Sequence, residues 1–432
     1  MLVAACLAML PALSWPWPLD GYAETGIRRI EASRLAHEGL VPGGKQPPGA
    51  LLSTAQVQLR LTHTDLRHLP GPDPEFTREV VAILGDQADR YSLLLLDLTV
   101  ADQPRYAEHR GDEKQNVGSV GKLLAGLGLL QALADVWPDD FERRQAVLRD
   151  TVVTADPFAV SDHHTIRLFD VATNTLVRRP MQIGDQGALY EELDWTFSVS
   201  SNSAASMVMR EAMLLRQLGA RYPMPDAAIA SFFRNTPARE LTRLFQATFW
   251  EPVTRNGMGL SDIRQGSFFT AGGKKQVNGG GNSYATAKAL LQMMLLMEQG
   301  KLVDAWSSLE LKRLLYVTER RIRYASSPAL RNAAVYSKSG SWWGCKEEAG
   351  FDCQPYHGNL RNYMNSVSII EEQTGGISLY YMVVLISNVL RENSAIIHQT
   401  MATRIHQLIR REHGLPGADP PYLVREHESA RK

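Results

Sequence analysis

A serine and a lysine three positions apart are the first residues in this sequence that could do chemistry together. Ser119 and Lys122 begin a segment with helical periodicity, and side chains three residues apart lie on the same face of a helix. A serine hydroxyl is a poor nucleophile until a neighbouring base takes its proton, which the amine could do. Free backbone N–H groups at a helix start also favour negative charge on an attacked carbonyl. Taken alone, Ser119 would serve equally well as a helix N-cap.

Two more short motifs follow along the chain. Ser200-Ser201-Asn202 precedes a helical pattern, and Lys338-Ser339-Gly340 lies within an expected strand. Alone, the first motif is an ordinary helix cap and Lys338 an ordinary exposed strand lysine. Gly340 suits a strand whose backbone must come close to a ligand. If Lys338 shares a cleft with Lys122, repulsion between the two amines should make Lys122 easier to deprotonate.

In this order the motifs read S-x-x-K, S-x-N and K-[ST]-G, the set typical of one group of acyl-transferring enzymes. On them the chain resembles the serine β-lactamase and D,D-peptidase (penicillin-binding protein) superfamily, nearest to its class A-like branch. The resemblance covers approximately residues 75 to 412. It implies an acyl-enzyme formed at Ser119, proton transfer by Lys122, and no metal or organic cofactor.

The resemblance also implies roles for the residues around the nucleophile. Ser200 would protonate the leaving nitrogen, and Asn202 would position the substrate amide. Lys338, with Ser339 and Gly340 beside it, would bind a substrate carboxylate. The backbone N–H groups of Ser119 and Ser341 would form an oxyanion hole, which typically lowers a barrier by several kcal/mol.

The base that activates water is harder to assign. Class A-like enzymes place a glutamate in an E-P-x-x-N pattern between the second and third motifs. Glu251 and Pro252 match its first half, but the asparagine comes at Asn256, one position late. Glu240, or no such base at all, are the alternatives, and Glu251 could simply be a surface glutamate before a loop proline.

These alternatives lead to different functions. A base at Glu251 favours a class A-like β-lactamase that hydrolyses β-lactam amides. Without a base, a D,D-peptidase acting on the D-Ala-D-Ala ends of peptidoglycan peptides is favoured, because such an enzyme reacts with penicillin yet releases it slowly. A third possibility is a non-catalytic cell-envelope protein, which a Lys122 buried far from Ser119 would favour.

Apolar segments at both ends of the chain predict the elements that must position these motifs. The expected strands cover residues 91–100, 105–110, 334–343, 362–371 and 378–390, and a terminal helix covers 395–412. Helical patterns dominate between them, beginning with 119–137. We therefore expect an α/β plus all-α fold. Its antiparallel sheet is built from residues 75–140 and 331–412 and flanked by helices, and an all-helical domain, 141–330, is inserted.

The first residues predict export. Residues 1–13 are nearly all apolar, and Ala12-Leu13-Ser14 suits a signal peptidase, so 1–14 is predicted to be a signal segment, with a frayed apolar terminus as the plainer alternative. The sequence before Cys6 resembles a lipobox, which would allow membrane anchoring through the N-terminus. Residues 15–74 are interpreted as a linker and a packing arm, and 413–432 as a C-terminal tail.

Two of the three cysteines support an oxidising compartment. Cys345 and Cys353 flank a polar loop and can meet as a disulfide, with paired metal ligation as the weaker alternative. Such a disulfide agrees with a location in the periplasm or cell envelope.

Charge and clustering exclude some other functions. The 432 residues carry 46 basic and 46 acidic side chains, which argues against a nucleic-acid partner. Asp162-His163-His164 resembles a cluster of metal ligands, but adjacent histidines point apart on a helix or strand and no third ligand is spaced to join them. We therefore expect no metal, a small-molecule or peptide substrate, and a monomer.

Overall fold

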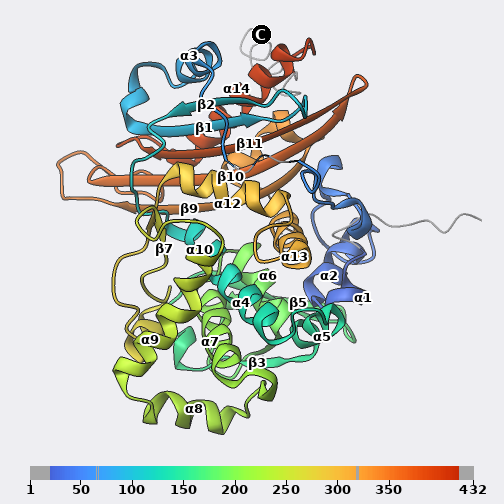
Figure 1. The fold of residues 1–432 in the computed structure, drawn as a ribbon, viewed down its shortest axis with the longest axis vertical. Helices are drawn as coiled ribbons and strands as arrows, with labels where there is room; N and C mark the ends of the chain where they lie inside the picture. The colour runs from blue at the N-terminus through green and yellow to red at the C-terminus, as the bar shows by residue number, and fades with distance from the viewer. Residues whose placement is uncertain (1–19, 65, 67, 318–320, 418–432) are drawn as a thin grey trace, which may run out of the picture.

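The centre of the molecule is one antiparallel sheet made from both ends of the chain. The computed structural model describes residues 20–64, 66, 68–317 and 321–417. Its five strands lie in the order β2-β1-β11-β10-β9 (Figure 1). They are β1 (Tyr91–Asp97), β2 (Arg105–His109), β9 (Ala334–Gly344), β10 (Arg361–Thr374) and β11 (Ile377–Asn388). The predicted mixed fold, with its sheet assembled from N- and C-terminal segments, is confirmed.

Both faces of this sheet are covered by helices, which explains the continuous apolar character of β1. Leu93 and Leu95 pack on the side of α14 (Ser394–Glu412) and α3 (Pro74–Ala82). Leu94 and Leu96 face the opposite way, into the core shared with α12 (Ala287–Glu298) and α13 (Ala305–Tyr316). Successive strand residues point to opposite faces, so a strand buried on both sides needs no polar alternation.

The inserted region is mainly helical. Its helices pack around α4 (Lys122–Val136), and its main members are α5 (Phe141–Asp150), α6 (Leu189–Phe197), α7 (Asn202–Leu218), α8 (Asp226–Asn235), α9 (Ala238–Phe249), α10 (Glu251–Arg255) and α11 (Ala271–Gln276). The structure adds three two-stranded sheets: β3 (Val152–Thr154) with β6 (Gln186–Ala188), β4 (Thr165–Asp170) with β5 (Thr175–Pro180), and β7 (Ile263–Arg264) with β8 (Tyr284–Ala285). β3, β6, β7 and β8 have two or three residues each, too few to be recognised from periodicity. β4 and β5 have six residues each, and they were not predicted from the sequence.

Helix α4 is the central helix of this region and begins at the first motif. A tight 3-10 turn, η4 (Gly118–Gly121), leads directly into it. Together they form a segment, Gly118–Val136, apolar enough by length and composition to cross a membrane. Most of the segment is buried inside the protein, however, as in the core helix of a globular domain. The motif residues therefore start a rigid, well-packed element.

Residues before the sheet form a packed arm rather than a bare linker. Helices α1 (Tyr22–Thr25) and α2 (Arg28–His37) lie against the inserted region (Figure 1). Ile27 and Ile30 are buried in the main core, and Arg29 forms a buried ion pair with Asp194 of α6 at 2.6 Å. The predicted signal segment 1–14, Cys6 and most of the predicted tail lie outside the described residues.

Candidate active site

The first motif places an amine directly against a hydroxyl. Ser119 lies in the η4 turn, and Lys122 is the first residue of α4. The Lys122 Nζ donates to Ser119 Oγ at 2.9 Å. It also donates to the Ser200 carbonyl oxygen at 2.8 Å and to Asn202 Oδ1 at 2.7 Å. The first two motifs, about 80 residues apart in sequence, therefore meet at one nitrogen.

The Lys122 amine is set up to take a proton. Its side chain is fully buried, and burial, helped by the positive charge of Arg323, lowers its pKa to about 7, with Asp162 opposing the shift. An amine with that pKa is partly neutral near pH 7 and can accept the Ser119 proton. The ring of Phe269 lies 4.9 Å from Lys122 Nζ and covers this side of the amine.

The third motif brings a second amine to the Ser200 hydroxyl, which also lies next to Lys122. Lys338 on β9 donates from Nζ to Ser200 Oγ at 2.8 Å, and that oxygen lies 3.3 Å from Lys122 Nζ. Burial lowers the pKa of Lys338 well below its usual range, and the nearby charges of Lys122 and Arg323 add to this. Ser200 has a positive φ of 60°. The Ser200 hydroxyl therefore bridges two amines, an arrangement suited to passing protons.

Close backbone contact joins the nucleophile turn to strand β9. A β-carbon placed on Gly340 would lie 2.5 Å from the Ser119 nitrogen and 2.4 Å from the Val117 carbonyl oxygen. A β-carbon on Gly118, which has a positive φ of 52°, would lie 3.1 Å from the Ser341 nitrogen. Only glycine fits at Gly340 without a shift of backbone. The backbone nitrogens of Ser119 and Ser341 therefore lie on the two closely packed segments, η4 and β9, as the predicted oxyanion hole requires.

Comparison with known proteins identifies structures with a similar fold. No protein-family model matches the sequence, and no curated protein matches it. Among solved structures, the TLA-3 extended-spectrum β-lactamase is similar with a TM-score of 0.50 and 11% identity, covering 78% of this chain and 98% of that one. This chain therefore has a β-lactamase fold. A β-lactamase from Sphaerobacter thermophilus DSM 20745 is similar with a TM-score of 0.48 and 13% identity, covering 77% of this chain and 97% of that one. PBP-A is similar with a TM-score of 0.47 and 14% identity, covering 79% and 99%.

Within this β-lactamase fold the structure adds an arginine that the motifs did not reveal. Arg323, in the turn η7 (Arg323–Ser326), donates to Ser339 Oγ at 3.0 Å and to Ser341 Oγ at 3.2 Å. Its guanidinium lies over the ring of Tyr356 at 4.9 Å. With Lys338 it places two basic side chains beside the third motif, an arrangement that suits an anionic group. Arg323 itself has a positive φ of 54° in this turn, and no motif spacing in the sequence predicts such a turn.

Asp162 holds the second motif in place. Its carboxylate accepts from Ser201 Oγ at 2.9 Å and from the backbone nitrogens of Asn202 and Ser203 at 2.7 and 3.0 Å. It therefore satisfies free N–H groups at the start of α7. Burial alone would raise the pKa of Asp162, but the hydrogen bond and charge of His164 and the backbone N–H groups lower it overall.

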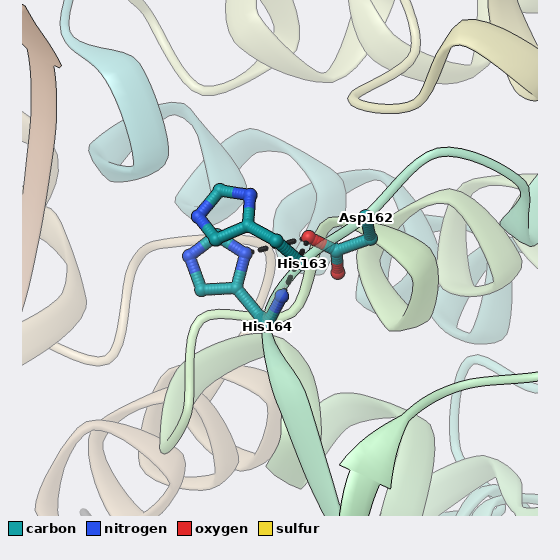
Figure 2. Close-up of side chains that lie close together, drawn as sticks. All are labelled: Asp162, His163 and His164. Carbon is teal, nitrogen blue, oxygen red and sulfur yellow. Dashed lines mark hydrogen bonds and ion pairs between the residues drawn. The ribbon is translucent and has the colours of Figure 1, made fainter.

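The two histidines beside it do not point apart as expected. Figure 2 shows the His163 and His164 rings stacked, with centroids 4.3 Å apart, and His164 Nδ1 lies 2.6 Å from Asp162 Oδ1. They lie in irregular backbone before β4, where Ser161 has a φ of 84°, so the alternation of a strand does not apply. The possible ligand atoms of the three residues lie within 4.8 Å of one another, but Asp162 Oδ2 already accepts hydrogen bonds at the start of α7 and Oδ1 from His164. That the protein needs no metal stays a prediction.

The structure does not bring Glu251 to the site. Glu251 begins α10 and forms an ion pair with Arg216 on the surface. Arg216 also lies 3.9 Å from Asp135, near the last turn of α4. Asp135 follows Lys122 by 13 residues of helix, or about 20 Å, so Glu251 lies at the far end of α4 from the nucleophile. A glutamate and a proline are common in a first helical turn, which explains the local pattern.

The remaining predicted residues are placed as follows. Glu240 lies exposed in the first turn of α9, on a shallow surface shared with α8 that includes none of the motif residues. Cys345 and Cys353 form a disulfide in the loop that follows β9. Ser339 and Gly340 lie on β9 with Lys338, as the third motif predicts.

Proposed function

We propose that the protein is a serine enzyme that is acylated at Ser119 by amides carrying a nearby carboxylate, namely β-lactams and D-alanyl-D-alanine peptides. Ser119 Oγ attacks the carbonyl carbon while Lys122 takes its proton. The C–N bond then breaks, and the nitrogen receives a proton through the Ser200 hydroxyl. The observation that carries this proposal is the contact of Lys122 Nζ with Ser119 Oγ, Ser200 and Asn202. It also speaks against a non-catalytic envelope protein.

Release of the acyl group is proposed to be slow, as in a D,D-peptidase. Among the residues that the structure describes, no carboxylate hydrogen-bonds to Ser119, Lys122 or Ser200. The ring of Phe269 lies over Lys122. Water at the ester would therefore lack the carboxylate base that a class A-like β-lactamase requires, so efficient β-lactam hydrolysis becomes the second candidate. It is supported only by the fold.

The proposed function agrees with an exported protein. The Cys345–Cys353 disulfide is stable in oxidising compartments and rare in the cytosol. We therefore propose export to the periplasm or cell envelope, where peptidoglycan peptides are found, and action as a monomer.

A labelling experiment tests the proposed function. Incubation with a fluorescent penicillin should give one stable covalent adduct whose mass equals that of the intact penicillin, and Ser119→Ala should give none. A chromogenic cephalosporin should be opened once per enzyme molecule and then only slowly. Repeated fast turnover that needs Ser119 would favour the β-lactamase. Absence of both reactions in the folded protein would contradict the proposal.

Replacing Glu251 should leave acyl-enzyme release unchanged. In Glu251→Gln the decay of the penicillin adduct should agree with the unmodified protein within about twofold, because removing a working general base would cost about 10²- to 10⁴-fold. The free energy of unfolding should fall by no more than about 1 kcal/mol, since the pair with Arg216 is half-exposed. Adduct decay followed by mass spectrometry decides this, and a hundredfold slower release would return Glu251 to the mechanism.

A further inference from the structure

Strand β9 carries an exposed tryptophan just beyond the glycine that packs against the nucleophile. β9 and β10 lie side by side in a regular antiparallel register (Figure 1), so alternate residues of β9 share one face. On that face, Lys338 reaches Ser200, and Gly340 packs on the turn that holds Ser119. Trp342 comes next, about 7 Å further along the strand. It is 42% exposed, more than any other tryptophan that the structure describes.

Two side chains of β10 hold this tryptophan in place. Tyr363 is the partner of Trp342 in the ladder, and their rings are stacked with centroids 5.7 Å apart and planes 13° from parallel. The Arg361 guanidinium lies over the indole, 4.5 Å from the ring centroid. Both arrangements are favourable for an aromatic ring. Trp342 is therefore a fixed and partly exposed surface against which the ring of a ligand can stack.

Arg361 adds a positive charge that is not paired within the described part of the chain. No ion pair or side-chain hydrogen bond joins Arg361 to another described residue, and its buried Nε has no hydrogen-bond acceptor. Glu348, in the loop after β9, is instead paired with Arg391 at 2.7 Å and accepts from Asn359 at 3.0 Å. The Arg361 guanidinium thus keeps its N–H donors for a ligand, and their geometry suits a carboxylate.

The direction of β9 decides which half of a substrate meets these side chains. In the proposed reaction the carboxylate belongs to the half that leaves with the nitrogen, and this half lies toward Lys338 and Ser339. The reacting carbonyl lies between the backbone nitrogens of Ser119 and Ser341. The acyl half, which stays on the nucleophile, therefore extends the other way along the strand, toward Trp342.

We propose that Trp342 and Arg361 select the acyl half of the substrate and favour one that carries a ring and a second carboxylate. The ring stacks on the indole, and the carboxylate accepts from the guanidinium. This inference rests on the proposed acylation at Ser119 and deepens it, because it states which amides the site prefers. Both residues act on substrate selection and not on proton transfer.

Three penicillins that differ only at the carbon beside a phenyl ring test the proposal. Benzylpenicillin has no charge at that carbon, carbenicillin has a carboxylate and ampicillin has an amine. Each competes for Ser119 with a fluorescent penicillin whose acyl half carries no carboxylate. The second-order rate constant of acylation is measured at about 150 mM salt, where distant charges are screened. Carbenicillin should react about tenfold faster than ampicillin, with benzylpenicillin between them, because a charge-assisted hydrogen bond is gained.

The outcomes separate this proposal from the function on which it rests. Equal rates for the three penicillins, or the reverse order, would overturn the selection and leave acylation at Ser119 standing. Absence of labelling by any penicillin in the folded protein would contradict the acylation itself, and the selection with it.

Variants then assign the preference to the two side chains. Arg361→Gln should bring the three rates within about twofold of one another, whereas Arg361→Lys should keep part of the spread because it keeps the charge. Trp342→Ala should slow all three penicillins about fivefold to tenfold. Trp342→Phe, which keeps an aromatic ring, should restore most of the rate. A merely structural role would lower the three rates equally in Arg361→Gln and leave their spread unchanged.

Arg143 supplies the matched control. Its guanidinium also lies over a tryptophan, Trp137, at 5.6 Å from the ring, but Trp137 caps the end of α4 opposite to Lys122. Arg143 is exposed, so Arg143→Gln should keep both the order and the spread of the three rates. A spread lost in Arg143→Gln, or kept in Arg361→Gln, would show that the charge of Arg361 does not select the substrate. Thermal unfolding of each variant distinguishes lost selection from lost folding.

Discussion

Replacing Lys122 by methionine is expected to lower the rate of acylation by fluorescent penicillin about a thousandfold. Methionine keeps a long, flexible side chain but cannot take the Ser119 proton, and removal of a positioned base costs about 10²- to 10⁴-fold. The amine is the only group that contacts Ser119 Oγ among the hydrogen bonds of the described residues, so no second base is in place. The second-order rate constant of labelling is the measurement.

The pH dependence of the unmodified protein gives an independent check of the same role. Lys122 acts as a base only when neutral, and its pKa is about 7. The acylation rate should therefore rise with pH, reach half of its maximum near pH 7 and become level about one pH unit above that. Lys301→Met, at an exposed lysine, should keep both the rate and this profile. A flat profile in the unmodified protein, or a loss below tenfold in Lys122→Met, would place the base elsewhere.

The elements that carry the site could be predicted because their apolar segments are long. β1 and α4 are continuous apolar segments whose burial on several sides matches their composition. The sheet formed from the two ends of the chain follows from strands lying before and after a helical stretch. The small sheet of β7 with β8 has only two residues in each strand and therefore shows no detectable period.

Some site residues could be predicted from their motifs and others could not. Ser119, Lys122 and Ser200 were predicted because their motifs hold local chemistry, although the contacts among them depend on tertiary packing. Arg323 was not predicted, because a turn with positive φ brings it to β9. Glu251 was assigned from a local pattern that a helix start also produces, and only the position of α10 at the far end of α4 separates the two meanings.

Asp162 illustrates why a cluster of polar residues cannot be assigned from sequence. With its neighbours Asp162 resembles a set of metal ligands, although no metal is expected there from the sequence. In the structure its Oδ2 accepts from backbone N–H groups some 40 residues later at the start of α7. A free helix N-terminus attracts a carboxylate from any part of the chain that passes close to it. The sequence contains the carboxylate and the helix but does not show that they are in contact. This contact holds Asn202 in place against Lys122.

A single methyl group at Gly340 is expected to lower the acylation rate by about a hundredfold or more. The β-carbon of Gly340→Ala would lie 2.4 Å from the Val117 carbonyl oxygen, 2.5 Å from the Ser119 nitrogen and 2.7 Å from the Val120 nitrogen. These are backbone atoms, so β9 and the η4 turn must move apart. A misplacement of about 1 Å at a reacting group can cost about 10²-fold. Labelling rates with fluorescent penicillin, together with thermal unfolding, measure the effect.

Gly344 supplies the matched control on the same strand. The three atoms nearest to a β-carbon there all belong to the Arg361 guanidinium, the first at 3.0 Å. A flexible side chain can turn away, so Gly344→Ala should label at the normal rate. The methyl group of Gly340→Ala does not touch the Lys122 amine, so the rate should fall at every pH while the midpoint stays near 7. That result separates placement of the nucleophile turn from proton transfer. A shifted midpoint, or equal rates in the two alanine variants, would show that close packing of β9 on η4 does not control the reaction.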